Sequence, residues 1–321
     1  ASDVYKRQEY KSTLTNDELE ELVKKTKELK EYQDTPSSQE DLEKIPMLEL
    51  SDIKREPAKD YNDVKSVDGI KIVHHNIFTN KIAYINMSFD TKCVPDELIP
   101  YMGLLGSTLS LMDTKNYTYP ELTNEININC GGLATGTALY SDKVDFSKNT
   151  IVYEVKSKAL YEKVPFVLGM MEEIMYNTRF DDYKRLKEII ARIKSRLEAS
   201  LMGQGHSIAM LECCAQFSES AYYSDILRGY KYYEFIKKLD EEFEQNKTQI
   251  VDKLNKLVGY IFNKDNVIVS LTADDEGYDC FVKALSAKSC NIKDEHYNTA
   301  VRSFIPVNVK TGYTSASQVQ Y

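Results

Sequence analysis

The order of strand-like and helix-like segments constrains the fold of this chain more than any other feature of its sequence. Residues 81–89 alternate apolar and polar side chains, so Ile85, Met87 and Phe89 share one face, as expected for a half-buried strand. Residues 149–157 and 265–274 repeat this alternation. Between these two strands, apolar residues recur at helical spacing over 160–177, 181–203, 206–217, 230–245 and 248–262.

Strands and helices are therefore grouped rather than alternating one by one. Residues 64–75 consist of two extended stretches around Asp68-Gly69, which is a strong signal for a hairpin turn. Grouping of this kind is typical of antiparallel sheets, whereas parallel sheets alternate with crossover helices. We therefore predict an α+β fold, in which a mainly antiparallel mixed sheet has helices packed on one face.

A helical arm precedes the sheet. Thr15 and Glu18 form a capping-box pattern at the start of a helix. The apolar side chains that follow at helical spacing are Leu19, Leu22, Val23 and Leu29. The remaining positions are rich in Glu and Lys, so we expect this stripe to be buried on another surface. Residues 1–8 fit no part of the pattern, and we interpret them as a non-native adaptor.

Composition and charge exclude several classes of protein. The chain has 41 Lys and Arg against 50 Asp and Glu, a formal net charge of −9, whereas nucleic-acid binding favours a basic surface. No apolar run approaches the roughly 20 residues of a membrane-spanning helix, and none marks a signal peptide. The six cysteines form no CxxC pair, so we expect reduced thiols. These features indicate a soluble intracellular protein with no nucleic-acid or membrane partner.

The residues of common catalytic sites do not occur at the spacing that catalysis requires. A helical zinc site needs two histidines four residues apart or in the inverted arrangement, with a general-base Glu, yet the chain contains neither HExxH nor HxxEH. His74 and His75 are adjacent and should point to opposite faces of an extended segment, while His206 and His296 each stand alone. A GxSxG nucleophile elbow and a P-loop are absent as well. We therefore predict no catalytic residue, no metal ligand and no cofactor in this chain.

Several long strings nevertheless resemble one family of peptidases. The matching strings are ELVKKTKELKEYQDTPSSQEDLEKIPMLELSDI at 21–53, VDGIKIVHHNIFTNKIAYINMSFD at 67–90, YTYPELTNEININCGGL at 117–133 and FDDYKRLKEIIARIKSRLEASLMGQGHSIAM at 180–210. They are similar to the central part of presequence proteases, in the pitrilysin–insulysin clan of zinc metallopeptidases. The resemblance covers nearly the whole chain from about Leu14.

The resemblance implies an organisation that the residues alone do not reveal. It divides the chain into a linker hairpin over 1–60, a non-catalytic peptidase-associated domain over 61–300, similar to those of mitochondrial processing peptidases, and a truncated following domain from 301 to 321. In that family, related α+β domains enclose a chamber, and the first domain carries HxxEH and the zinc. The expected partners are thus a catalytic N-terminal half and a C-terminal domain of the same polypeptide, together with peptide substrates. Bacterial cytoplasm is the preferred compartment, with an organellar matrix as the alternative.

We predict from this resemblance a non-catalytic, chamber-forming domain of a zinc metalloendopeptidase that degrades short unstructured peptides and is inactive in isolation. The alternative is a free-standing pseudo-peptidase scaffold or assembly domain, and sequencing the gene beyond Tyr321 would distinguish the two. The polar side of the strands would form the chamber wall, at Asn86, Ser88, Glu154 and Lys156. An ordinary solvent-exposed face remains the alternative for these four residues. We also expect the fragment to self-associate through its apolar stripe.

Overall fold

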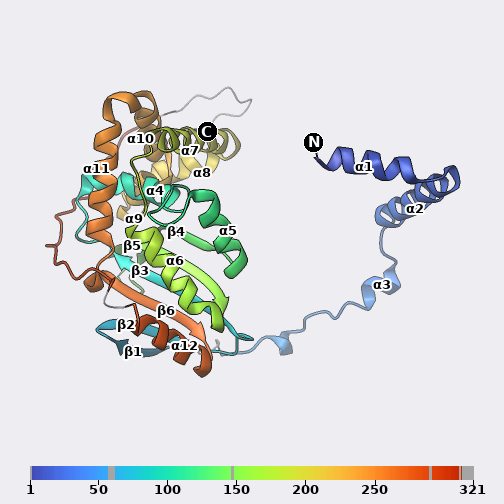
Figure 1. Cartoon of the computed structure of the whole chain (residues 1–321), viewed down its shortest axis with the longest axis horizontal. Helices are drawn as coiled ribbons and strands as arrows, with labels where there is room; N and C mark the ends of the chain where they lie inside the picture. Colours follow the sequence, from blue (N-terminus) through green and yellow to red (C-terminus); the bar gives the residue numbers. More distant parts are fainter. Residues whose placement is uncertain (1, 57–61, 146–147, 289–290, 311, 313–321) are drawn as a thin grey trace. The chain divides into compact units, whose positions relative to one another are not determined.

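The computed structural model describes residues 2–56, 62–145, 148–288, 291–310 and 312 (Figure 1). The chain divides into two units, residues 1–59 and 60–321, and each is described by itself. Among the described residues, no helix is long and apolar enough to cross a membrane. The described cysteines are free thiols, and Cys290 lies outside the described residues.

The first unit contains short helices joined by extended segments. They are α1 (Ser2–Thr13), α2 (Asn16–Asp34), α3 (Gln39–Glu43) and the 3-10 turn η1 (Leu50–Asp52). The predicted capping box is present, since the Thr15 hydroxyl accepts from the Glu18 amide and the Glu18 carboxylate accepts from the Thr15 amide. No residue of α2 is buried: Leu22, Val23 and Leu29 are 47%, 67% and 54% exposed.

The second unit is built on a six-stranded sheet. Its strands are β1 (Asp63–Val67), β2 (Ile70–Asn76), β3 (Ile82–Asp90), β4 (Leu133–Ser141), β5 (Asn149–Leu160) and β6 (Val267–Ala273), in the spatial order β1-β2-β6-β3-β5-β4. The β2–β6 pair is parallel and the other four pairs are antiparallel. Asp68 and Gly69 both have positive φ, as a tight hairpin turn between β1 and β2 requires. The predicted α+β fold is confirmed.

Most of the helices of this unit follow β5 in the chain. The whole set is α4 (Ile99–Thr108), α5 (Tyr119–Asn129), α6 (Val164–Tyr176), α7 (Tyr183–Gly203), α8 (Gly205–Cys214), α9 (Glu219–Arg228), α10 (Tyr230–Glu241), α11 (Phe243–Ile261) and α12 (Asp275–Ser286). The prediction missed α9, which begins where the Ser218 hydroxyl accepts from the Ala221 amide. The predicted helix over 206–217 ends at Cys214, and the break expected near 246–247 lies at Glu242 instead.

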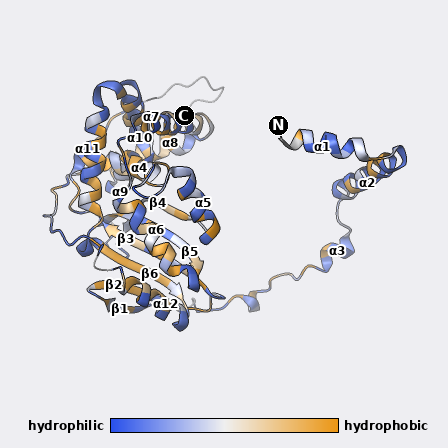
Figure 2. Ribbon diagram, in the orientation of Figure 1, coloured by the Kyte–Doolittle hydropathy of each residue, from blue (hydrophilic) through white to orange (hydrophobic). Residues whose placement is uncertain are grey.

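One face of the sheet is covered by helices, with α6 and α12 lying against it (Figure 1). The side chains of this face are almost fully buried: Ile85, Met87, Phe89, Tyr153, Val155, Val269 and Leu271. Figure 2 shows the apolar colouring concentrated along the strands and the inward sides of the helices. The alternation in the sequence therefore identifies the correct face of each strand.

The C-terminal segment runs along the second unit without joining the sheet. Within residues 301–310 no strand forms, although the sequence predicts one, because no neighbouring strand offers a ladder of hydrogen bonds. The Arg302 side chain instead donates to the carbonyl oxygens of Thr91 and Val94, and the Val307 amide donates to the carbonyl of Gln216 at 2.8 Å. The strand-like end at 318–321 lies outside the described residues.

Candidate functional site

The four predicted wall residues lie together on the second face of the sheet. Antiparallel pairing of β3 with β5 sets Asn86 opposite Lys156 and Ser88 opposite Glu154. Side chains directly opposite one another in a ladder lie on the same face. Lys156 is exposed, and Asn86 and Ser88 are half-buried. The register therefore makes these four residues one contiguous polar surface.

Glu154 is the most constrained residue of this surface, at only 5% exposed. Its carboxylate accepts hydrogen bonds from Asn86 Nδ2 at 2.9 Å and from the Tyr140 hydroxyl at 2.9 Å, and it pairs with Lys156 Nζ at 2.7 Å. Burial acts to raise the pKa of Glu154, but the bonds from Lys156, Asn86 and Tyr140 outweigh it and lower the pKa. The surface thus contains a fixed, ionised carboxylate.

Tyr140 is a member of this site that the sequence analysis missed. It lies on β4, where Tyr140 is paired with Thr150, and its side chain reaches Glu154 on the neighbouring strand. Alternation along residues 133–141 could have indicated its face, but not which strand lies beside it. Hydrogen bonding to Glu154 adds to burial in raising the pKa of Tyr140, so its hydroxyl keeps its proton and remains a donor.

A hollow of about 480 Å3 adjoins the four residues. The polar groups that line it come from β3, β5 and β6: Tyr84, Asn86, Lys156, Lys158, Ser270 and Thr272. Hydroxyl, amide and ammonium groups can bind the polar atoms of a peptide, but this set lacks a nucleophile with an adjacent base. The arrangement supports binding rather than bond cleavage.

The histidines do not form a catalytic metal site. His74 is fully buried on the helix-covered face and contacts the carbonyl of Ala273 at 3.0 Å, whereas His75 lies on the other face and contacts the Ser270 hydroxyl at 3.1 Å. In the described part of the chain, one group could offer three ligand atoms to a metal, namely Asp265, Asp294 and His296, all exposed. His296 is already hydrogen-bonded to Asp265, and the group has no helical HxxEH arrangement, so it does not fit a peptidase zinc centre.

Comparison with known proteins connects this geometry to a family. The family model that matches describes a domain associated with peptidases of metallopeptidase family 16, subfamily C, and it covers residues 5–239, most of the chain. The chain belongs to this peptidase-associated family. The match begins within the segment 1–8 that the sequence analysis set aside as an adaptor.

The relatives of this peptidase-associated chain are longer proteins. It is 37% identical over 298 residues to "Protein HypA" of Clostridium perfringens, covering 91% of this chain and 30% of the relative. It is 29% identical to "Presequence protease 1, chloroplastic/mitochondrial" of Arabidopsis thaliana, covering 82% and 24%, and 27% identical to "Presequence protease, mitochondrial" of Drosophila melanogaster, covering 70% and 21%. The chain thus spans less than a third of the length of these relatives. The resemblance to presequence proteases is confirmed, and the relatives include bacterial and mitochondrial proteins.

Proposed function

We propose that this chain is a non-catalytic, chamber-forming domain of a zinc metalloendopeptidase that degrades short unstructured peptides, and that the chain by itself is inactive. The observation that carries the proposal is the family match over residues 5–239, to a family described as peptidase-associated. The absence of HExxH and HxxEH from the sequence supports the non-catalytic role. Zinc would then be held by a catalytic N-terminal half of the same polypeptide, and a C-terminal domain would complete the chamber.

The polar sheet face is the part of the domain that would meet the peptide. Asn86, Ser88, Glu154 and Lys156 would form part of the chamber wall, beside the 480 Å3 hollow. An unfolded peptide carries unsatisfied backbone N–H and C=O groups, and a surface of hydroxyl, amide and charged groups can pair with them. A purely apolar wall would favour only apolar side chains. The fixed Glu154 carboxylate would add a preference for basic residues of the peptide.

The partners that follow are peptide substrates and the remaining domains of the parent polypeptide. The net charge of −9 disfavours nucleic acid, and we propose no membrane partner. The compartment we propose is the bacterial cytoplasm, with an organellar matrix as the alternative, since the relatives include bacterial and organellar proteins.

The test compares the 321-residue chain with its full-length parent. Both are assayed for bound zinc by atomic absorption and for cleavage of an unstructured fluorogenic peptide, with and without a chelator. We expect about one zinc per parent molecule and chelator-sensitive cleavage, and neither property in the isolated chain. A tightly held zinc and chelator-sensitive cleavage in the isolated chain would falsify the proposal. A parent that binds no zinc and cleaves no peptide would instead favour the scaffold.

A further inference from the structure

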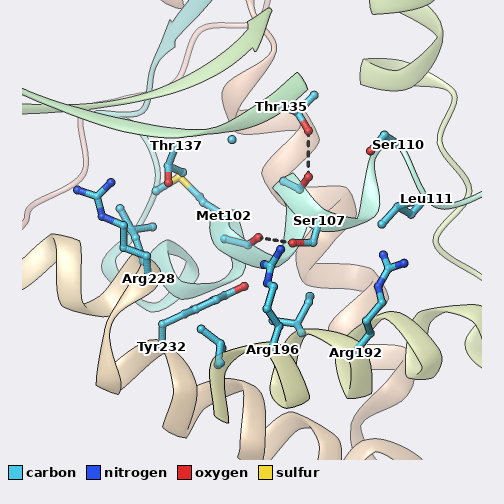
Figure 3. A pocket seen from close by; sticks show the side chains of 16 residues that line it. Met102, Ser107, Ser110, Leu111, Thr135, Thr137, Arg192, Arg196, Arg228 and Tyr232 are labelled. Carbon is cyan, nitrogen blue, oxygen red and sulfur yellow. Dashed lines mark hydrogen bonds between the residues drawn. The ribbon is translucent and has the colours of Figure 1, made fainter. Parts of the chain in front are cut away.

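A second cavity, of about 620 Å3, lies on the helix-covered side of the second unit (Figure 3). Residues of α4, the edge strand β4, α7 and the α9–α10 region line it. This volume falls within the range of about 300–1,000 Å3 that is typical of small-molecule sites. The cavity is separate from the hollow beside Glu154, and the two share no lining residue.

Small residues on one side of α4 create the space. Gly103, Gly106, Ser107 and Ser110 follow one another at helical spacing and all line the cavity. Gly106 also lets the helix approach β4 closely, since a Cβ atom at this position would lie 3.2 Å from the Cα atom of Gly136. Larger side chains at these positions would fill the volume, so the sequence of α4 keeps it open.

Three arginines border this volume without any acidic neighbour. Arg192 and Arg196 extend from α7 toward α4 in Figure 3, and Arg228 lies at the end of α9. None of the residues that line the cavity is Asp or Glu, in a chain with a net charge of −9. Within the described part of the chain, Arg192 and Arg196 form no ion pair or hydrogen bond, and Arg228 donates one bond, to the Ser224 hydroxyl at 3.5 Å. Three clustered guanidinium groups repel one another, so an anion between them would be stabilised.

The hydroxyl of Tyr232 gives an independent indication of a ligand. Tyr232 is 4% exposed, it lines the cavity, and in Figure 3 its ring extends toward Arg196. Its hydroxyl oxygen is buried with no hydrogen-bond partner among the described residues. A buried polar atom without a partner is costly and calls for an explanation. Burial also raises the pKa of Tyr232, so the hydroxyl keeps its proton and can donate to an anion.

We propose that this cavity binds a small polyphosphate anion, with Arg192, Arg196 and Arg228 as the cationic ligands and Tyr232 as a hydrogen-bond donor. A planar guanidinium pairs with two phosphate oxygens at once, and Arg is favoured wherever phosphate groups are recognised in this way. A single carboxylate would balance only one of the three positive charges, whereas a diphosphate or triphosphate group balances several. The hydroxyls of Ser110 and Thr137 also line the cavity and can donate further bonds. This inference does not depend on the proposed peptidase role.

The test is a calorimetric titration of the whole chain with inorganic pyrophosphate and, in a second arm, with ATP. Replacing both Arg192→Gln and Arg196→Gln should weaken pyrophosphate binding about tenfold or more, because two bidentate contacts are lost. The matched control is Arg179→Gln with Lys184→Gln, which removes the same charge from exposed positions outside the cavity and should change binding less than about twofold. Tyr232→Phe should weaken binding severalfold while preserving the packing of the ring.

Four outcomes are informative. Equal affinity for pyrophosphate and ATP would identify the phosphate chain as the recognised group, and tighter binding of ATP would identify a nucleotide. Equal weakening by the cavity variant and its control would reveal diffuse surface attraction and overturn the proposal. A wild-type chain that binds neither anion at millimolar concentration would overturn it as well. Circular dichroism melting curves of each variant separate loss of binding from loss of folding.

Discussion

Gly103 on α4 lies directly against the ring of Tyr232 on α10, so closely that a Cβ atom at position 103 would come within 2.7 Å of the ring carbon Cε2. The carbonyl oxygen of Leu227 would lie 3.0 Å away on another side. A methyl group here therefore has no free volume to enter, and Tyr232, which is buried, cannot swing away without leaving the core. The contact holds α4 and α10 at their separation and orients the tyrosine toward the arginine-lined cavity.

The first prediction is that Gly103→Ala destabilises the chain. Overpacking a close helix contact lowers the free energy of unfolding by about 1–3 kcal/mol, although alanine favours a helix over glycine. Urea unfolding followed by circular dichroism measures the change. The control is Gly203→Ala at the end of α7, where a Cβ atom meets nothing within 4 Å and stability should be unchanged or slightly higher. Equal stability of the two variants would contradict the packing argument.

The second prediction concerns Glu212, whose carboxyl group lies beside Asp225 and Lys231. Burial and the neighbouring Asp225 raise the pKa of Glu212 to about 7. Because the folded-state pKa lies above that of the unfolded chain, the folded state holds the proton more tightly. Stability from this group is fully present below the ordinary Glu pKa of about 4.3 and declines as pH rises through 7. Glu212→Gln should remove this decline and raise the free energy of unfolding near pH 8 by on the order of 1 kcal/mol.

Urea unfolding at several pH values between about 5 and 8 measures the Glu212 effect. Glu241→Gln serves as the control, because Glu241 is exposed on α10 and pairs loosely with Lys237 at 4.0 Å. A Glu212→Gln variant with the same pH dependence as the wild type would refute the raised pKa.

The third prediction concerns Glu154, whose pKa shift has the opposite sign. Its hydrogen bonds lower the pKa, so its contribution is present above the ordinary Glu pKa of about 4.3 and disappears as pH falls through the lowered value. Glu154→Gln should lower the free energy of unfolding near pH 7 by about 1–3 kcal/mol, since bonds to a charged group are lost. The wild type should lose more stability than this variant between about pH 6 and pH 3. Glu162→Gln, at an exposed position, should follow the wild type.

The fourth prediction reverses the charge of Glu154 in the full-length parent. If the polar face contacts substrate, Glu154→Lys should reduce kcat/KM for basic peptides severalfold more than for neutral peptides of the same length. Peptide pairs that differ only in Lys-to-Gln replacements supply the measurement, and thermal melting tests whether the variant is folded. The same fractional loss for both kinds of peptide would leave an ordinary solvent-exposed face as the better explanation.

The fifth prediction is that the isolated chain self-associates through the α2 stripe. Leu22, Val23 and Leu29 are exposed, and apolar side chains gathered on one helix face favour association. Sedimentation velocity should detect concentration-dependent dimers or larger species that diminish in Leu22→Ser with Leu29→Ser. Lys24→Ser with Lys27→Ser alters the polar positions of the same helix and should leave association intact. A wild-type chain that stays monomeric at all concentrations would argue against this use of the stripe.

Local periodicity determined much of this protein before any tertiary contact is considered. Alternation along 81–89 and 149–157 is a property of each strand alone, and it identified Met87 and Tyr153 as core residues and Asn86 as a residue of the polar face. The Thr15 capping box was readable for the same reason, because its hydrogen bonds join residues three positions apart. The absence of a helical zinc motif was also a matter of local spacing.

Only the tertiary structure decided which segments became neighbours. Strand β6 follows β5 by more than a hundred residues, yet it lies between β2 and β3 and runs parallel to β2. The same long-range packing brings Tyr140 to Glu154 and gathers Arg192, Arg196 and Arg228 around one cavity. No periodicity in the sequence encodes these pairings, because they depend on which buried faces fit together best once all the elements have formed.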